Sequence, residues 1–159
     1  MAFVTLDDGS GQMEIRIFPE VYEPHRSLIV EDAILLAQGA LSWDEFNQTT
    51  RLNVDRVLDW DTARAEYARR LLLRLDAAQC AAGALRQLAS ILAEHRAGGR
   101  CSVWIEYTGP QARVELVLGQ NWRAKPSDAL LKRLRDLTGG EGRVTLLYDR
   151  SSVIEHTAS

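Results

Sequence analysis

Apolar and polar residues alternate over two short runs near the start of the chain. Residues 3–6 are aromatic, aliphatic or β-branched, and residues 13–18 place apolar side chains on one face with Arg16 and Phe18 on the other. A period of two is typical of half-buried strands. The Asp- and Gly-rich segment between the runs favours a tight turn, so the pattern predicts a β-hairpin.

The pattern continues as strands up to residue 60. Residues 20–31, which Pro24 interrupts, predict a short helix or an irregular crossover. Residues 33–41 form an apolar run whose Gly39 indicates a bulge or a tight bend. Residues 51–58 alternate again. The predicted order is therefore strand, strand, crossover, strand, strand.

A helical pattern separates this first part from the second. Residues 61–70 predict a short linker helix capped by Asp61 or Thr62. A buried strand follows at 71–75, and then a helix that begins at Asp76 with Gln79 at the capping-box spacing. This helix carries one apolar stripe, made by Ala81, Leu85, Leu88 and Leu92.

The remaining residues predict a hairpin, a helix and a last strand. The hairpin pairs 101–107 with 112–118, the helix covers about 127–138, and the strand covers 143–148. The order β-α-β-β-α-β matches a ferredoxin-like split βαβ unit. We therefore predict an α+β chain divided into 1–60, the linker helix 61–70, a small ferredoxin-like domain at 71–148 and a flexible tail at 149–159.

Charge divides the chain in the same way. The net charge is −3, yet residues 1–60 hold four arginines against eleven carboxylates, a net −7, and residues 61–159 carry a net +4. Such an asymmetry suggests two units with different partners. The composition is that of a soluble globular protein without a membrane span or a secretory signal, and two cysteines are too few for a disulfide framework. We expect a cytoplasmic protein.

Motifs of enzymes and of metal sites are absent from the sequence. No phosphate-binding glycine loop, dinucleotide fingerprint or paired metal-ligand spacing is present. Asp7–Asp8 and Asp44–Glu45 could bind a metal, but nearby turn residues favour capping of their own backbone. Cys101 lies in a predicted strand and is interpreted as a core residue. We therefore expect no catalytic residue, no metal and no cofactor.

Two stretches of sequence resemble one known family. The segment Val4 to Gly11, with the strand ending at Phe18 and the pattern Gly39-x-Leu41-Ser42-x-Asp44-x-Phe46, resembles the OB segment of the bacterial DNA polymerase III alpha subunit. Tyr67-Ala68-Arg69 is similar to the helix that follows this barrel. The most specific match is Gly119-x-x-Trp122-Arg123-x-x-Pro126-Ser127-Asp128-x-Leu130-Leu131-x-x-Leu134-Arg135-x-Leu137.

The resemblance implies the C-terminal, non-catalytic region of that subunit, acting in DNA replication. It implies an OB-type barrel near the single-stranded template, followed by a domain that docks the tau subunit of the clamp loader. The nucleotidyltransferase residues of the DNA-directed DNA polymerase lie upstream in the family, so this chain is not expected to polymerise DNA. An OB barrel has five strands, and four are readable here, so we expect an incomplete barrel whose first strand is missing.

The first set of candidate residues concerns single-stranded DNA. Exposed aromatic rings can stack on bases, and arginines neutralise phosphates. The candidates are Arg16, Phe18, Trp43, Phe46 and Arg51. Trp43 and Phe46 could instead cover one end of the barrel. With a net −7 over residues 1–60, we expect binding to be weak.

The second set concerns the tau subunit, because Trp and Arg are favoured interface residues. The candidates are Trp122, Arg123, Lys132, Arg133 and Arg135. Trp122 could instead be a core residue and the basic row a solvated helix face. The missing strand also predicts an unpaired barrel edge through which the chain could dimerise.

Two other classes of function remain open. One is a freestanding OB-fold module of the anticodon-binding type that binds RNA or single-stranded DNA, which would predict a basic, complete barrel. The other is an enzyme or small-ligand sensor, which would predict a pocket with convergent polar groups.

Overall fold

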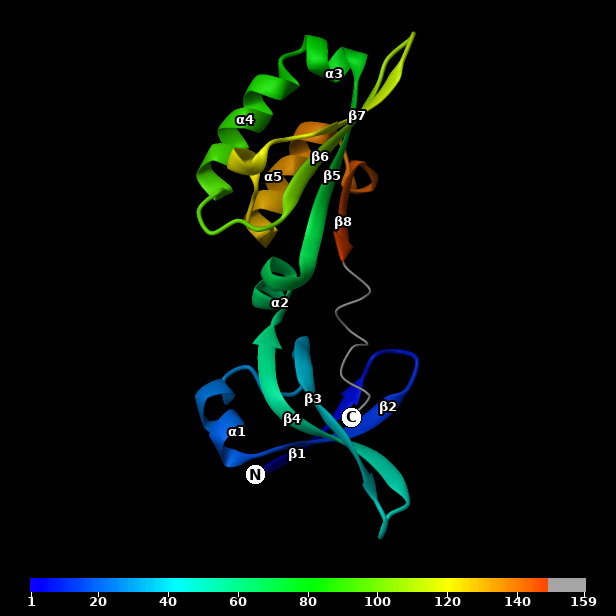
Figure 1. The fold of residues 1–159 in the computed structure, drawn as a ribbon, viewed down its shortest axis with the longest axis vertical. Helices are drawn as coiled ribbons and strands as arrows, with labels where there is room; N and C mark the ends of the chain where they lie inside the picture. Colours follow the sequence, from blue (N-terminus) through cyan, green and yellow to red (C-terminus); the bar gives the residue numbers. More distant parts are fainter. Residues whose placement is uncertain (149–159) are drawn as a thin grey trace. The chain divides into compact units, whose positions relative to one another are not determined.

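A computed structural model describes residues 1–148 of the chain (Figure 1). The predicted tail at 149–159 lies outside the described residues. No helix among the described residues is long and apolar enough to cross a membrane.

The chain divides into two compact units, one of Met1–Ala63 and one that begins at Arg64. The elements are β1 Ala2–Asp7, β2 Gln12–Ile17, α1 Pro19–His25, β3 Leu35–Asp44, β4 Thr49–Asp59, α2 Trp60–Tyr67, β5 Ala68–Asp76, α3 Ala77–Ala81, α4 Ala84–His95, β6 Ser102–Thr108, β7 Arg113–Val117, η1 Gln120–Trp122, α5 Asp128–Thr138, η2 Glu141–Arg143 and β8 Val144–Tyr148.

The first unit is a four-stranded mixed sheet in the order β1-β2-β4-β3. The predicted hairpin is confirmed, since β1 and β2 pair antiparallel from Ala2–Ile17 to Asp7–Gln12. The carboxylate of Asp8 accepts backbone N–H bonds from Ser10 and Gly11, which fixes the turn. Strand β4 then lies between β2, to which it runs parallel, and β3, to which it runs antiparallel.

This sheet is open, because β1 and β3 are its two edges among the described residues. Its fully buried core contains Ile15, Ile17, Val54 and Val57. The inward residues of the edge strands, including Val4, Leu6, Leu35 and Ala37, are only partly buried. The prediction of an unclosed four-stranded barrel is consistent with this arrangement.

The bulge predicted at Gly39 is confirmed. The β3–β4 register shifts between Gln38 and Gly39, since Gln38 faces Arg56 while Gly39 faces Val54. A Cβ on Gly39 would lie 1.8 Å from the backbone oxygen of Asn53. Glycine is therefore required here by the close approach of the two backbones.

The predicted linker helix begins and ends earlier than expected. Helix α2 covers Trp60–Tyr67, and strand β5 already begins at Ala68. The cap is neither Asp61 nor Thr62: the Asp59 carboxylate accepts the backbone N–H of Thr62 at 2.6 Å. Asp59 takes the capping role because it is the last residue of the preceding strand, three residues before Thr62.

The second unit has the predicted order of elements but not the predicted ferredoxin-like sheet. The strand order is β7-β6-β5-β8. Strands β5 and β6 are parallel direct neighbours, with Leu71 opposite Val103, so the βαβ unit is not split. The tight β6–β7 hairpin leaves β7 on the outer edge of β6, since β5 occupies its inner edge. Strand β8 adds antiparallel to the far side of β5.

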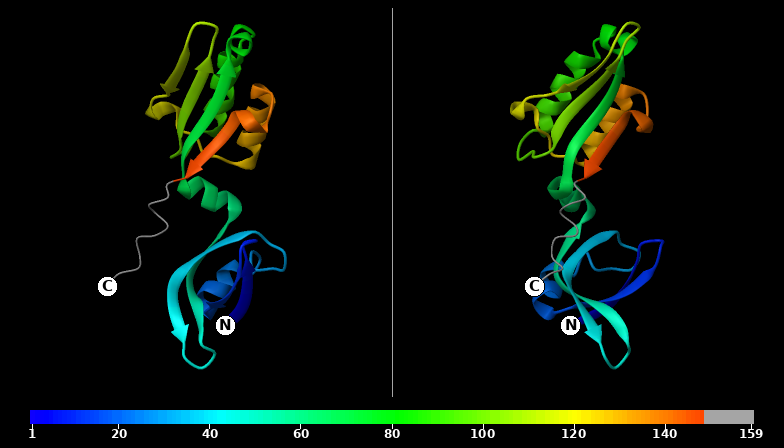
Figure 2. Two further views of the ribbon diagram at one scale, coloured as in Figure 1. Left: turned by 90° about the vertical axis from the view of Figure 1, so that its right-hand side faces the viewer. Right: turned by 45° about the vertical axis from the view of Figure 1, so that its right-hand side comes forward.

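Two helices, α4 and α5, cover one face of this sheet (Figure 2). Their buried residues, among them Leu88, Leu92, Leu130 and Leu134, pack with the inward residues of β5 and β6. The long helix predicted from Asp76 is in fact two helices, because Gly83 adopts a left-handed conformation between α3 and α4. Asp76 and Gln79 form the predicted capping box.

Cys101 is a core residue, as predicted. Its side chain is fully buried, and burial raises the pKa of its thiol to about 11. A thiol with this pKa is almost entirely protonated at neutral pH, so it is a poor nucleophile.

Candidate nucleic-acid interface

The outer face of the first sheet brings together an aromatic ring and two guanidinium groups. Because strand residues alternate, Ile15 and Ile17 point into the core while Arg16 points outward. The register places Phe3 of β1 beside Arg16 of β2 and Arg16 beside Asn53 of β4. Phe3, Arg16 and Asn53 therefore form one row on the outer face of the sheet, across β1, β2 and β4.

Phe3 is the exposed centre of this cluster. Its side chain is 53% exposed, and its ring centroid lies 5.7 Å from the Arg16 Cζ and 5.9 Å from the Arg51 Cζ. An exposed ring beside cations is an arrangement on which a nucleic-acid base can stack. Phe3 was not among the residues predicted from sequence, although its pairing with Arg16 follows from the hairpin register.

The two arginines differ in their electrostatic surroundings. Arg51 is largely buried, with its Nε 2.6 Å from the Glu14 carboxylate and a second ion pair to Asp44. Arg16 forms no ion pair with the described residues, and its Nε is buried without a hydrogen-bond partner there. Arg16 is therefore the cation of this face that remains for a phosphate, while Arg51 ties β2 and β3 to β4.

The other predicted aromatic residues lie apart from Phe3. Trp43 pairs with Thr50 near the β3–β4 turn, and Phe46 in that turn is 94% exposed. Trp43 and Arg51 fall on opposite faces of the sheet, because the register alternates between them. Phe18 is exposed at the N-cap of α1. The five predicted residues therefore do not form one cluster.

Both acidic pairs considered as metal ligands instead cap turns, as the sequence favoured. Asp44 accepts the backbone N–H groups of Phe46 and Asn47, and the bond from Asn47 contributes most to lowering the pKa of Asp44. Hydrogen bonding to Gln12 likewise lowers the pKa of Asp7. Among the described residues, no group of three or more His, Cys, Asp or Glu side chains could hold a metal ion.

The predicted partner-binding residues of the second unit lie on η1, α5 and the segment between them. Trp122 is 37% exposed and Arg123 is exposed. Ala124, which follows Arg123, is fixed in place because it exchanges two backbone hydrogen bonds with Cys101. Trp122 is thus neither a buried core residue nor fully solvated.

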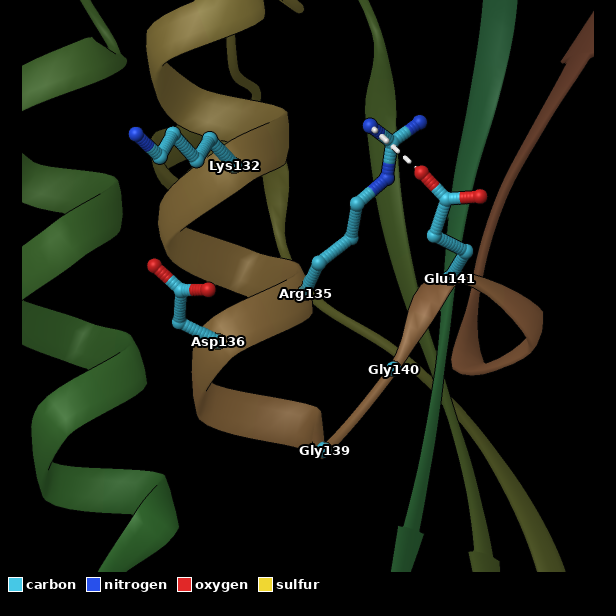
Figure 3. Close-up of a pocket in the computed structure, with 6 residues that line it drawn as sticks. All are labelled: Lys132, Arg135, Asp136, Gly139, Gly140 and Glu141. Atoms are coloured by element: carbon cyan, nitrogen blue, oxygen red, sulfur yellow. Dashed lines mark ion pairs between the residues drawn. The ribbon is translucent and has the colours of Figure 1, made fainter.

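The basic row on α5 is largely engaged within the unit. Arg133 contacts the Glu94 carboxylate of α4 at 2.5 Å, and its hydrogen bond lowers the pKa of Glu94. Arg135 reaches toward Glu141 at 3.6 Å, while Lys132 points away from both (Figure 3). Lys132 forms no ion pair with the described residues.

An open pocket at the end of α5 contains no catalytic arrangement. It is lined by Lys132, Arg135, Asp136, Gly139, Gly140 and Glu141 (Figure 3). Its two cations and two carboxylates balance, and it has no nucleophile beside a general base. The alternative of an enzyme or small-ligand sensor gains no support from this pocket.

Both units are similar to known proteins. Residues 1–59 match the model of the OB-fold nucleic acid binding domain, and residues 87–139 match that of the DNA polymerase III subunit alpha, C-terminal domain. The DNA polymerase III subunit alpha of Pseudomonas fluorescens is 39% identical over 139 residues, which are 87% of this chain and 12% of the relative. The subunit from Escherichia coli K12 is 37% identical over 145 residues, 91% of this chain and 12% of the relative. That from Haemophilus influenzae is 30% identical over 149 residues, 94% of this chain and 13% of the relative.

Proposed function

We propose that this chain, which corresponds in sequence to the C-terminal region of bacterial DNA polymerase III alpha subunits, acts in the replisome by contacting single-stranded DNA and docking the clamp-loader tau subunit. The chain spans about 12% of the length of the relatives it matches. We therefore propose polymerase activity only for a whole subunit that contains this region. We assign no catalytic step to this chain. We place its action in the cytoplasm, with the rest of the replication machinery.

The order of the two family matches supports this proposal over a freestanding OB module. An anticodon-type module would account for residues 1–59 but not for 87–139, which match a domain of the polymerase subunit. The similarity to the alpha subunits also runs through both units, across about nine-tenths of the chain.

The observation that carries the DNA-binding part is the exposed Phe3 ring with two guanidinium groups within 6 Å of it. Stacking of one base on such a ring contributes about 1–3 kcal/mol. Because residues 1–60 carry a net −7, repulsion of phosphates will keep the affinity low. Arg16 is the proposed phosphate contact, while Phe18, Trp43 and Phe46 remain proposals for a longer strand.

Replacing Phe3 with alanine is expected to weaken binding of a single-stranded oligonucleotide by roughly 5- to 150-fold, because one stacking platform is lost. Fluorescence anisotropy at low salt measures this change. Val30→Ala, which truncates another exposed apolar side chain of the unit, serves as the control. Unchanged affinity for Phe3→Ala together with a loss for Phe46→Ala would move the interface to the β3–β4 turn.

Tau docking is proposed for the second unit, with Trp122, Arg123, Lys132, Arg133 and Arg135 as candidate contacts. Calorimetric titration of the chain with the C-terminal part of a cognate tau subunit is expected to give a saturable one-to-one complex. Trp122→Ala should weaken it with the fold intact, since this ring is only partly buried. A well-folded chain that does not bind tau would overturn this part of the proposal.

We also propose that the free edges β1 and β3 can pair with another strand, including that of a second copy. Unpaired N–H and C=O groups along an edge strand are a template for such pairing. Concentration-dependent dimerisation in sedimentation experiments would support this contact.

A further inference from the structure

Helices α4 and α5 lie on one face of the second sheet, and among the described residues the other face carries neither of them (Figure 2). Leu71 and Leu73 of β5 pack in the core with residues of α4 and α5, so Leu72 points to the opposite face. The register places Leu72 beside Trp104 of β6 and Trp104 beside Val117 of β7. We use the name open face for the row of Leu72, Trp104 and Val117 together with the neighbouring residues that point to the same side of the sheet. Adjacent parallel strands such as β5 and β6 are usually covered on both faces, so the open face has the character of an unpartnered surface.

Trp104 is held rigidly at the centre of the open face. Its Nε1 donates to the Ser102 hydroxyl at 3.0 Å, and that hydroxyl donates to the backbone oxygen of Arg69 at 2.8 Å. The Arg70 guanidinium carbon lies 4.4 Å from the Trp104 ring centroid. A fixed Trp–Arg stack loses little conformational freedom when a partner binds, which is why these residues are frequent anchors of protein interfaces.

Three guanidinium groups on this side of the sheet, those of Arg70, Arg74 and Arg113, face the two carboxylates of Glu106 and Glu115, which leaves one positive charge in excess. Arg74 and Arg113 share the single carboxylate of Glu106, at 3.4 Å and 2.9 Å. Arg70 forms no ion pair with the described residues. A partner that brings a carboxylate would therefore find Arg70 available beside an apolar row.

We propose that the open face docks an amphipathic α-helix of the partner protein, with apolar side chains on Leu72, Trp104 and Val117 and a carboxylate opposite Arg70. This inference rests on the proposed docking of tau and names a surface for it that the sequence did not suggest. A nucleic-acid strand fits less well. Arg70 already stacks on the indole ring at 4.4 Å and occupies the place where a base would stack.

The test compares two charge reversals and one introduced charge, each in the whole chain, in titrations with the C-terminal part of a cognate tau subunit. Arg70→Glu on the open face should weaken binding at least tenfold, as should Val117→Asp, which places a charge in the apolar row. Arg86→Glu makes the same charge change at an exposed position of α4, on the covered side, and should leave the affinity unchanged. Circular dichroism of each variant shows that the fold is retained.

Each other outcome overturns the inference in a recognisable way. Loss of tau binding with Lys132→Glu but not with Arg70→Glu or Val117→Asp would place the docking site on α5 and leave the proposed function standing. Loss of oligonucleotide binding alone with Arg70→Glu would make the open face a nucleic-acid site. Failure of the unmodified chain to bind tau would overturn the proposed docking itself, and the inference with it.

Discussion

Replacing Gly39 with alanine is expected to unfold the first unit while the second stays folded. The new Cβ would lie 1.8 Å from the Asn53 carbonyl oxygen and 2.9 Å from the Val54 Cα, both backbone atoms of the neighbouring strand. No side-chain rotation relieves such a clash, so β3 and β4 must separate at the bulge. Overpacking typically costs about 1–3 kcal/mol and more where backbone has to move, so we expect a loss of at least about 3 kcal/mol.

The first unit has little stability to lose. Its fully buried core contains four residues, and both edges of its sheet are open among the described residues. Urea denaturation followed through amide NMR signals reports each unit separately. Gly11→Ala is the matched control, because a Cβ there meets no atom within 4 Å. Equal midpoints for the two variants would show that the strands do not approach as closely as described.

The second large effect is expected at Leu88 of α4. Its side chain is 2% exposed and packs in the core of the second unit. Truncation of a buried leucine to alanine costs about 2–5 kcal/mol, since both transfer energy and packing are lost. Leu88→Ala should therefore lower the free energy of unfolding of the second unit by that amount.

Leu85, one turn earlier on the same helix, provides the control. It is 49% exposed, so Leu85→Ala should change the stability by less than about 0.5 kcal/mol. Thermal denaturation of the two variants measures the difference. Similar losses for both would mean that Leu85 belongs to the buried stripe of α4, as the sequence alone suggested, and contradict its exposed position.

This pair shows where a periodic pattern misleads. The four- and three-residue spacing of Ala81, Leu85, Leu88 and Leu92 predicts one continuous helix face. Gly83 separates Ala81 from this face with a left-handed backbone, and the buried stripe of α4 runs through Ala84, Leu88, Ile91 and Leu92, so Leu85 lies beside it. The capping box at Asp76, by contrast, depends only on two residues three apart and was predicted correctly.

Local pairing was easier to predict than sheet order. The β1–β2 hairpin follows from alternation around a short turn, and the Gly39 bulge follows from glycine within an apolar strand. The order of elements in the second unit is compatible with more than one sheet. The apolar pattern along β5 and β6 does not indicate whether another strand lies between them. The direct pairing of Leu71 with Val103 in the structure shows that the two strands are neighbours.

The sequence pattern identified only some of the residues that the structure brings together at the candidate interface. Arg16 was identified from its outward position. Phe3 becomes a candidate only because two arginines of other strands lie beside its ring. Arg51 was predicted as a phosphate contact, yet Glu14 and Asp44 already neutralise it. Ion pairs between strands are not visible in a pattern that is read along one strand at a time.

The most direct test of the central claim, that each unit serves a different partner, is hydrogen exchange of the whole chain with each partner in turn. With a single-stranded oligonucleotide, we predict added protection only in the first unit, centred on β1 and β2. With the C-terminal part of tau, we predict added protection only in the second unit. Protection of the same unit by both partners, or of neither unit by tau, would contradict the account.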